Sequence, residues 1–169
     1  MRGALAALLA VVGLAGCARA PAGPTRPAPT PEGEVAARRA FDALLALDGE
    51  WIATESGKDF PARFEVVSAR SAVLQRSGFL AAYYLDFDGV MVTCFPDDGF
   101  QMRFRARGLA PDGKTLDFRL LDATNLRSGV AHGTRFTIEL RSADELVQRW
   151  WWTDGTTETA IEILFRRLR

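Results

Sequence analysis

Histidine and cysteine are almost absent from this chain of 169 residues, which has one histidine and two cysteines. This scarcity excludes a zinc cage of cysteine and histidine ligands. Acidic and basic side chains are balanced, at 21 each, and no basic stretch stands out. Proteins that follow nucleic-acid phosphates carry a basic excess or a basic face. The composition therefore predicts no structural zinc domain and no nucleic-acid partner.

Motifs of common enzyme classes are missing as well. The sequence has no glycine-rich phosphate loop, no Gly-x-Ser-x-Gly and no His-Glu-x-x-His. Cys94 and His132 are the only thiol and imidazole outside the N-terminal segment, and no third residue that would orient such a pair is identifiable. An isolated cysteine is usually a small buried hydrophobe. We therefore predict no catalytic centre, and an enzyme built on Cys94 and His132 is the weaker alternative.

A long apolar run occurs only near the N-terminus, at residues 4–14 after a single Arg2. This run is shorter than the roughly 20 residues of a membrane-spanning helix, and it suits the apolar region of a secretory signal peptide. It ends in Leu-Ala-Gly-Cys at 14–17, which resembles the lipobox of bacterial lipoproteins. Residues 1–16 are therefore predicted to be a lipoprotein signal peptide. An ordinary signal peptide followed by an incidental cysteine is the alternative.

The resemblance to a lipobox implies cleavage before Cys17 and lipidation of that cysteine. Several acyl chains, at about 0.8 kcal/mol per buried methylene, hold a protein firmly on a membrane. The expected location is the bacterial cell envelope, with the protein facing the periplasm. Ala18 in place of aspartate resembles an outer-membrane sorting signal. Lipidation would leave Cys94 as the free thiol, so no intrachain disulfide is expected.

Residues 17–33 form the predicted lipidated tether, in which five of the eight prolines gather. Proline-rich chain is extended and semi-rigid, at roughly 3.1 Å per residue. Residues 34–47 follow, with apolar side chains at helical spacing and charged side chains on the other faces. We expect one short amphipathic helix here, which ends at Asp48 and Gly49.

In residues 48–169 the apolar side chains recur at every second position, so this part of the chain is predicted to be all-β. Asp-Gly dipeptides recur in this part of the chain, and they tolerate the positive φ angles of tight hairpin turns. Short strands joined in this way form an antiparallel meander, and closure into a barrel removes its exposed edges. We therefore predict a closed or nearly closed barrel of about ten strands. The expected strands are 50–56, 61–67, 71–77, 79–87, 90–96, 99–107, 114–121, 132–140, 145–153 and 157–167.

Gly49, Glu50 and Trp51 open the first expected strand directly after the helix. This arrangement resembles the Gly-x-Trp signature of the lipocalin and calycin β-barrels. In that pattern the tryptophan closes one barrel end and an arginine of the last strand stacks over its ring, which implies Arg167 here. A cation over an indole face contributes about 0.5–2 kcal/mol, depending on desolvation.

A second resemblance, to small bacterial lipocalin-like domains of unknown function, covers most of residues 48–169. In those domains the fifth strand often carries Thr-His-Tyr-Cys and the eighth opens with His-Met-His. This chain departs from both patterns, because Cys94 stands in Thr-Cys-Phe-Pro and His132 is followed by Gly-Thr. The departure removes most of the histidine cluster on which a metal or redox role would depend. The matching stretches are 48–51, 122–126, 143–146 with Gln148 and Trp150, and 165–169.

The function expected for such a barrel is the binding of a small, mostly apolar ligand, or else a structural or interaction role. Barrels of this size either enclose one ligand or are filled by their own side chains. Cys94 and His132 are candidate ligand contacts. Both outcomes suit the aromatic side chains Tyr83, Tyr84, Phe104, Phe118, Phe136, Trp150, Trp151 and Trp152. Three consecutive tryptophans at 150–152 place rings on both faces of one strand, so one side fills the barrel and the other packs under the helix or lies at the surface.

Haem binding is the alternative function. The nitrobindins are similar in strand count and in their Gly-x-Trp opening, and they hold haem through one proximal histidine. That likeness implies His132 as the haem ligand, since a single imidazole is enough for this role.

Overall fold

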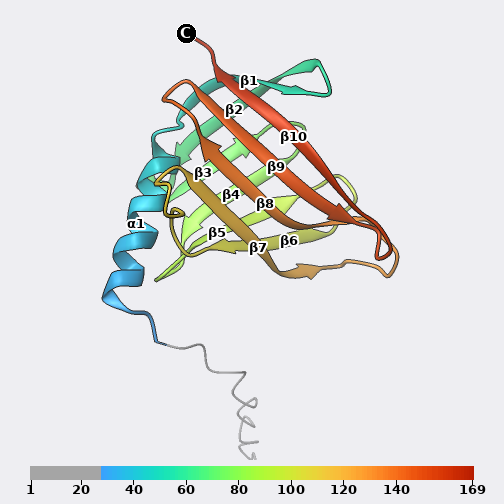
Figure 1. The fold of residues 1–169 in the computed structure, drawn as a ribbon, viewed down its shortest axis with the longest axis horizontal. Coiled ribbons are helices and arrows are strands. Elements are labelled where there is room, and N and C mark those ends of the chain that lie inside the picture. The colour runs from blue at the N-terminus through green and yellow to red at the C-terminus, as the bar shows by residue number, and fades with distance from the viewer. Residues whose placement is uncertain (1–27) are drawn as a thin grey trace, which may run out of the picture.

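The computed structural model describes residues 28–169. The predicted signal peptide, the predicted lipidation site Cys17 and most of the proline-rich tether therefore lie outside the described residues. In the described part, one helix precedes ten strands that form a closed antiparallel barrel (Figure 1). The prediction of an all-β meander barrel with a short N-terminal helix is confirmed.

The helix α1 (Pro31–Leu45) begins three residues before the predicted residue 34. The hydroxyl of Thr30 accepts a hydrogen bond from the backbone N–H of Gly33 at 3.1 Å, and Pro31 occupies the first helical turn, where its missing N–H costs nothing. The prediction assigned this proline to the tether, although proline is common at the first position of a helix. The buried face of the helix contains Ala37, Ala40, Phe41, Leu44 and Leu45.

The strands follow one another around the barrel in chain order, and β1 pairs with β10 to close it. Each strand pairs antiparallel with both neighbours, so the described barrel has no free strand edge. The strands are β1 (Gly49–Glu55), β2 (Lys58–Val67), β3 (Ala72–Arg76), β4 (Leu80–Leu85), β5 (Val90–Phe95), β6 (Gln101–Ala106), β7 (Thr115–Thr124), β8 (His132–Leu140), β9 (Glu145–Thr153) and β10 (Glu158–Arg167).

The strand bounds differ most from the prediction where a turn is not Asp-Gly. β2 begins at Lys58 and not at 61, because Ser56 and Gly57 make the preceding turn with positive φ angles of 50° and 76°. Two residues that accept positive φ are what a tight hairpin turn requires. β7 runs to Thr124, past the predicted 121, and Asn125 follows it with φ 61°.

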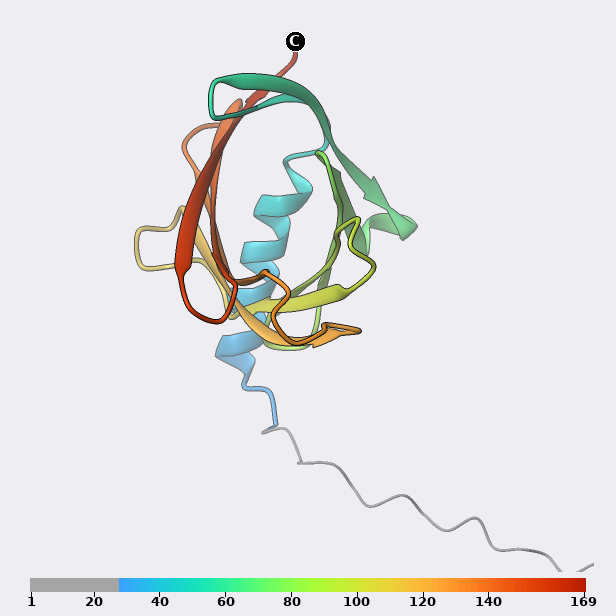
Figure 2. The same cartoon turned by 90° about the vertical axis from the view of Figure 1, so that its right-hand side faces the viewer.

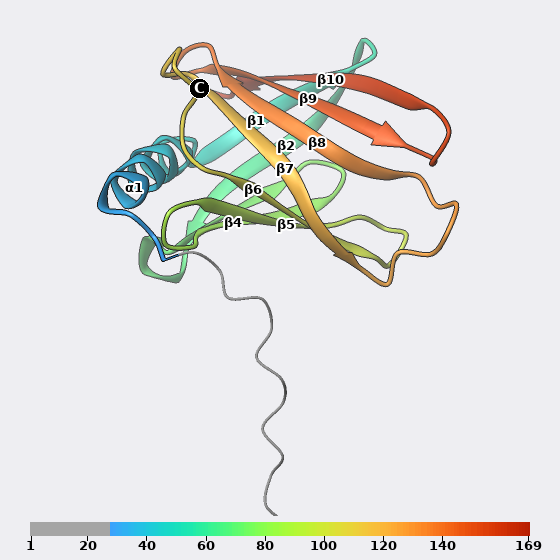
Figure 3. The ribbon, with the colours of Figure 1, turned by 60° about the horizontal axis from the view of Figure 1, so that its bottom comes forward.

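The helix α1 closes one end of the barrel. Figure 2 looks along the barrel and shows the helix across its far opening, and Figure 3 shows it beside one end from another side. Gly33 lies against Asp88 in the β4–β5 turn, and Ala36 lies against Gly108 after β6. Since Phe41 is fully buried, the helix acts as a plug, and the opposite end of the barrel is the open end.

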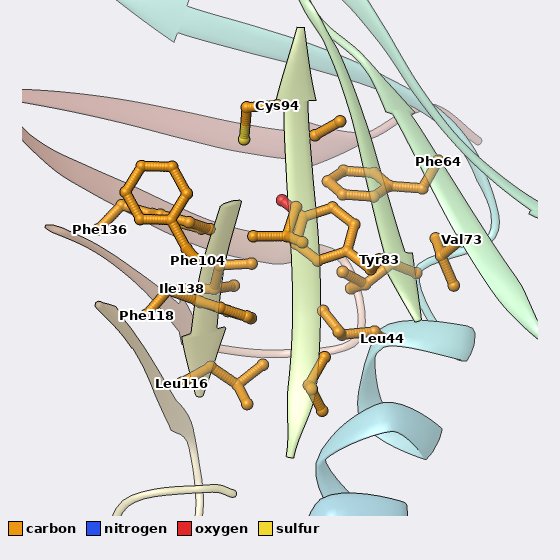
Figure 4. Close-up of a cluster of buried hydrophobic side chains, with 14 of the residues drawn as sticks. Leu44, Phe64, Val73, Tyr83, Cys94, Phe104, Leu116, Phe118, Phe136 and Ile138 are labelled. Atoms are coloured by element: carbon orange, nitrogen blue, oxygen red, sulfur yellow. The ribbon is translucent and has the colours of Figure 1, made fainter. Parts of the chain in front are cut away.

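Aromatic side chains fill the middle of the barrel (Figure 4). Phe118 stacks on Phe136 with ring centroids 4.5 Å apart, and Phe136 stacks on Trp150 at 4.0 Å. These rings come from β7, β8 and β9, where every second side chain points inward. On the outer wall, the guanidinium of Arg135 lies 4.6 Å from the ring of Trp151, which therefore packs under an arginine and not under the helix.

Candidate functional site

The open end of the barrel holds a cavity of about 570 Å³, which we call the mouth cavity. Its lining residues belong to β1, β2, β9 and β10 and to the turn that joins β3 to β4. The ends of these strands that carry them lie opposite α1, as the ribbon in Figure 3 shows. A larger hollow of about 710 Å³ lies outside the barrel, between α1 and the loop after β6. The mouth cavity is lined by Glu55, Phe60, Pro61, Ser77, Gly78, Phe79, Trp150, Trp152, Ile161 and Ile163.

The wall of the mouth cavity is mainly aromatic and aliphatic. The ring of Phe79 meets the ring of Trp150 edge-on, with centroids 5.5 Å apart and planes at 88°. Trp152 lies beside Trp150, with centroids 6.1 Å apart. Trp150 and Trp152 share the inner face of β9 because strand side chains alternate. Such contacts between rings hold the wall in one arrangement and leave an apolar surface for a ligand.

A buried polar network adjoins the mouth cavity and reaches its lining through Ser77 and Trp150. Gln75 on β3 and Gln148 on β9 exchange two hydrogen bonds across the barrel, with Nε2 to Oε1 distances of 3.2 and 2.8 Å. The amide of Gln75 also donates to the Ser77 hydroxyl at 2.7 Å and accepts from the Tyr83 hydroxyl at 2.6 Å. The indole N–H of Trp150 donates to Oε1 of Gln148 at 3.2 Å. We call these five side chains the amide floor.

The side chains of the amide floor are buried, and none of them is charged. Gln75 and Gln148 are fully buried, and a buried amide is tolerated only when its hydrogen bonds are made. Burial raises the pKa of the Tyr83 hydroxyl well above its usual value, so this side chain stays a neutral donor. The amide floor is therefore neutral, and it supplies no acid or base near neutral pH.

Of the predicted ligand contacts, Trp150 and Trp152 line the mouth cavity. Tyr84 lies half-buried on the outer face of β4, and its neighbour Tyr83 takes the inward position. Cys94 points into the barrel and is buried, but it is not among the lining residues. Burial raises the pKa of its thiol, so the thiolate that a nucleophile needs is disfavoured.

His132 lies on the other side of the barrel wall from Cys94. A Cβ placed at Gly133 would meet Phe104 and Met102, so position 133 faces inward and His132, one residue earlier, faces outward. Its Nδ1 lies 3.0 Å from the carbonyl oxygen of Val130. The two side chains therefore do not form the nucleophile and base pair considered from the sequence. His132 also does not fit the role of a ligand to haem held inside the barrel.

The sequence-based prediction missed Gln75, Ser77 and Gln148. A signal was present, because Gln148 interrupts the inward apolar residues Leu146, Trp150 and Trp152 at a spacing of two. Gln75 does the same after Val73 on β3. A polar residue at an inward position of a barrel strand indicates a buried hydrogen-bond partner.

The structural signature Gly49, Trp51 and Arg167 lies at the closed end. The Arg167 guanidinium carbon is 4.4 Å from the centroid of the Trp51 ring, as the sequence pattern predicts, and the indole N–H donates to the Leu47 carbonyl at 2.8 Å. Gly49 has φ 137°, and a Cβ there would lie 2.8 Å from Arg167 Nη1. Only glycine permits both this backbone angle and this close approach.

Comparisons with known proteins add no relative: no protein-family model matches the chain, and no curated protein matches it significantly. Among residues 28–169, no helix is long and apolar enough to cross a membrane. The same residues contain no group of three or more histidine, cysteine, aspartate or glutamate side chains placed to hold a metal ion. The mouth cavity is therefore the site on which a function is proposed.

Proposed function

We propose that this protein is a lipid-anchored barrel of the bacterial cell envelope that binds a small, mostly apolar ligand in the mouth cavity. The observation that carries the proposal is an open cavity of about 570 Å³ with aromatic walls, in which the lining residues Ser77 and Trp150 also belong to the buried amide floor. Small-molecule pockets have volumes of about 300–1,000 Å³, apolar walls and a few fixed polar groups. The barrel is thus filled by side chains towards its closed end and is hollow at its open end.

The proposed anchoring depends on the lipobox-like residues 14–17 and on the proline-rich tether that precedes α1 at Pro31. The described chain begins at the closed end, where α1 lies, and the mouth cavity is at the opposite end (Figure 3). A tether that joins at the closed end leaves the mouth free to exchange ligand. This arrangement supports a binding protein held at the outer membrane and facing the periplasm.

Titration of the full chain with N-phenyl-1-naphthylamine, an apolar fluorescent probe, tests the proposal. We expect saturable binding at one site and loss of about tenfold in affinity in Phe79→Ala, because the Phe79 ring forms the cavity wall. Phe87→Ala is the matched control, since Phe87 is 68% exposed in the β4–β5 turn at the closed end and should leave affinity unchanged. Equal affinity in both variants, or no binding by the unmodified chain, would overturn the proposal.

Two further measurements separate the competing functions. Extraction and mass spectrometry of the purified protein should reveal a co-purifying apolar compound. Visible absorbance tests the haem alternative. A Soret band in the unmodified protein that disappears in His132→Ala would show that the protein binds haem through His132. If the purified protein carries no apolar compound and shows no Soret band, but cross-links to an envelope protein in cells, a structural role would be favoured.

A further inference from the structure

The orientation of each amide in the amide floor is determined by one group that is only a donor. The indole N–H of Trp150 cannot accept, so the atom of Gln148 that faces it must be Oε1. Nε2 of Gln75 must then face this oxygen, and Oε1 of Gln75 must face Nε2 of Gln148. The Tyr83 hydroxyl, next to Oε1 of Gln75, is therefore the donor in that contact.

In this fixed arrangement, both amide oxygens already accept as many hydrogen bonds as they can. Oε1 of Gln75 accepts from Tyr83 and Gln148, and Oε1 of Gln148 accepts from Gln75 and Trp150. An amide oxygen has two lone pairs, so neither oxygen has capacity for a ligand. The amide floor thus offers a ligand no free amide acceptor.

Hydrogen-bond donors, by contrast, remain free in the mouth cavity. The oxygen of Ser77 accepts from Gln75, and the described residues give its hydroxyl proton no acceptor. The indole N–H of Trp152 is buried and also has no acceptor in the described part of the chain. Both residues line the cavity. A buried donor without an acceptor costs free energy, and a ligand oxygen bound to either donor would remove the cost at that donor.

The charge of the lining limits the kind of oxygen. Glu55 is the one ionisable side chain among the residues that line the mouth cavity, and no arginine or lysine accompanies it. A carboxylate or phosphate would enter an apolar site without a counter-charge and beside an acidic group, which is unfavourable. An uncharged carbonyl oxygen accepts the same hydrogen bonds without this penalty.

We propose, on the basis of the function proposed above, that the ligand is an uncharged apolar molecule with a carbonyl group, of the ester or ketone class. Its chain packs against Phe79, Trp150 and Ile161, and its carbonyl oxygen accepts from the Ser77 hydroxyl or from the indole N–H of Trp152. The arrangement makes Ser77 and Trp152 the residues that determine specificity, while the aromatic wall supplies affinity.

Displacement of N-phenyl-1-naphthylamine from the full chain by methyl decanoate, tridecane and decanoate tests the proposal. The ester should bind about five- to tenfold more tightly than the hydrocarbon, as expected for a hydrogen bond, and decanoate should bind more weakly than the ester. Ser77→Ala combined with Trp152→Phe should remove the preference for the ester and retain binding of tridecane. Ser128→Ala, an exposed serine in the β7–β8 loop, is the control and should keep the preference.

The carbonyl stretching frequency of the bound ester gives a second readout that does not depend on affinity. Hydrogen bonding should lower this frequency relative to the ester in hexane, and the combined Ser77→Ala and Trp152→Phe variant should remove most of this shift. Equal binding of ester and hydrocarbon, tighter binding of decanoate, or an unshifted carbonyl in the unmodified chain would overturn the carbonyl proposal while leaving a binding barrel. Failure of the probe itself to bind would instead overturn the proposed function.

Discussion

Replacement of Arg167 by alanine is the sharpest test of how the closed end of the barrel is held. The guanidinium donates to the carbonyl oxygens of Asp48, Ala46 and Ala143 at 2.6, 2.8 and 3.1 Å. It also stacks on the Trp51 ring. One side chain on β10 therefore joins the end of the helix, the start of β1 and the β8–β9 turn.

The expected loss of stability in Arg167→Ala is about 2–4 kcal/mol. Hydrogen bonds to a charged donor contribute about 1.5–3 kcal/mol each when buried, but water replaces part of this where the carbonyls are accessible. We therefore assign about 0.5–1 kcal/mol to each of the three contacts and about 0.5–1 kcal/mol to the stacking on Trp51. Lost packing of the side-chain stem acts in the same direction.

Urea denaturation followed by tryptophan fluorescence measures this loss. With a slope of about 2 kcal/mol/M for a domain of this size, the midpoint should fall by about 1–2 M. Arg166→Ala is the control: its side chain is 62% exposed on the outer face and makes only a long ion pair with Glu145, so its midpoint should shift by less than about 0.3 M. Equal midpoints for the two variants would refute a stabilising role for Arg167. Trp51→Ala should cost more, about 3–5 kcal/mol, because it empties a fully buried site.

Three more predictions concern single side chains. Cys17→Ser should abolish labelling by a fatty-acid analogue in cells, and retained labelling would refute lipidation at this cysteine. In the same variant Cys94 is the remaining thiol; because burial raises its pKa, a maleimide at pH 8 should modify it only after denaturation, and rapid reaction of the folded protein would contradict its burial. Hydrogen bonds from the backbone N–H of Thr157 and from Thr156 lower the pKa of Asp154 to about 2, so its contribution to stability is complete above pH 4 and is lost as the pH falls towards 2. The stability difference between the unmodified chain and Asp154→Ala should therefore shrink over that interval in denaturant titrations, and a constant difference would contradict this linkage.

The barrel could be predicted because its signals are local, since alternation within strands and Asp-Gly turns indicate a meander. The contact at its closed end was implied by the resemblance of Gly49 and Trp51 to the Gly-x-Trp signature, in which an arginine of the last strand covers the tryptophan. Tyr83 and Tyr84 were both predicted as candidate barrel residues, and only Tyr83 points inward, which shows the limit of such patterns. A shift of one residue moves a strand side chain to the other face, and the bounds of a predicted strand are less precise than that.

The amide floor could not be predicted in the same way, because its partners are distant in the chain. Gln75 and Gln148 are 73 residues apart and lie on strands that are not neighbours. Their meeting depends on the registers of β2, β1 and β10, which separate β3 from β9 around the barrel, and on closure of the ring. A glutamine among inward apolar residues predicts that a partner exists, but only the closed barrel identifies it.

Pairing of the first strand with the last also determines when the barrel can be completed during synthesis. The contact between Arg167 and Asp48 joins residues 119 positions apart, and β1 has no β10 to pair with until that strand has emerged. Contacts this distant in sequence make folding slow, on the scale of about milliseconds to seconds for barrel-like domains. Until then, the early strands form an incomplete sheet that is open to pairing with other chains. Newly made copies therefore have an interval in which a chaperone, or dilution, determines whether they close on themselves or aggregate.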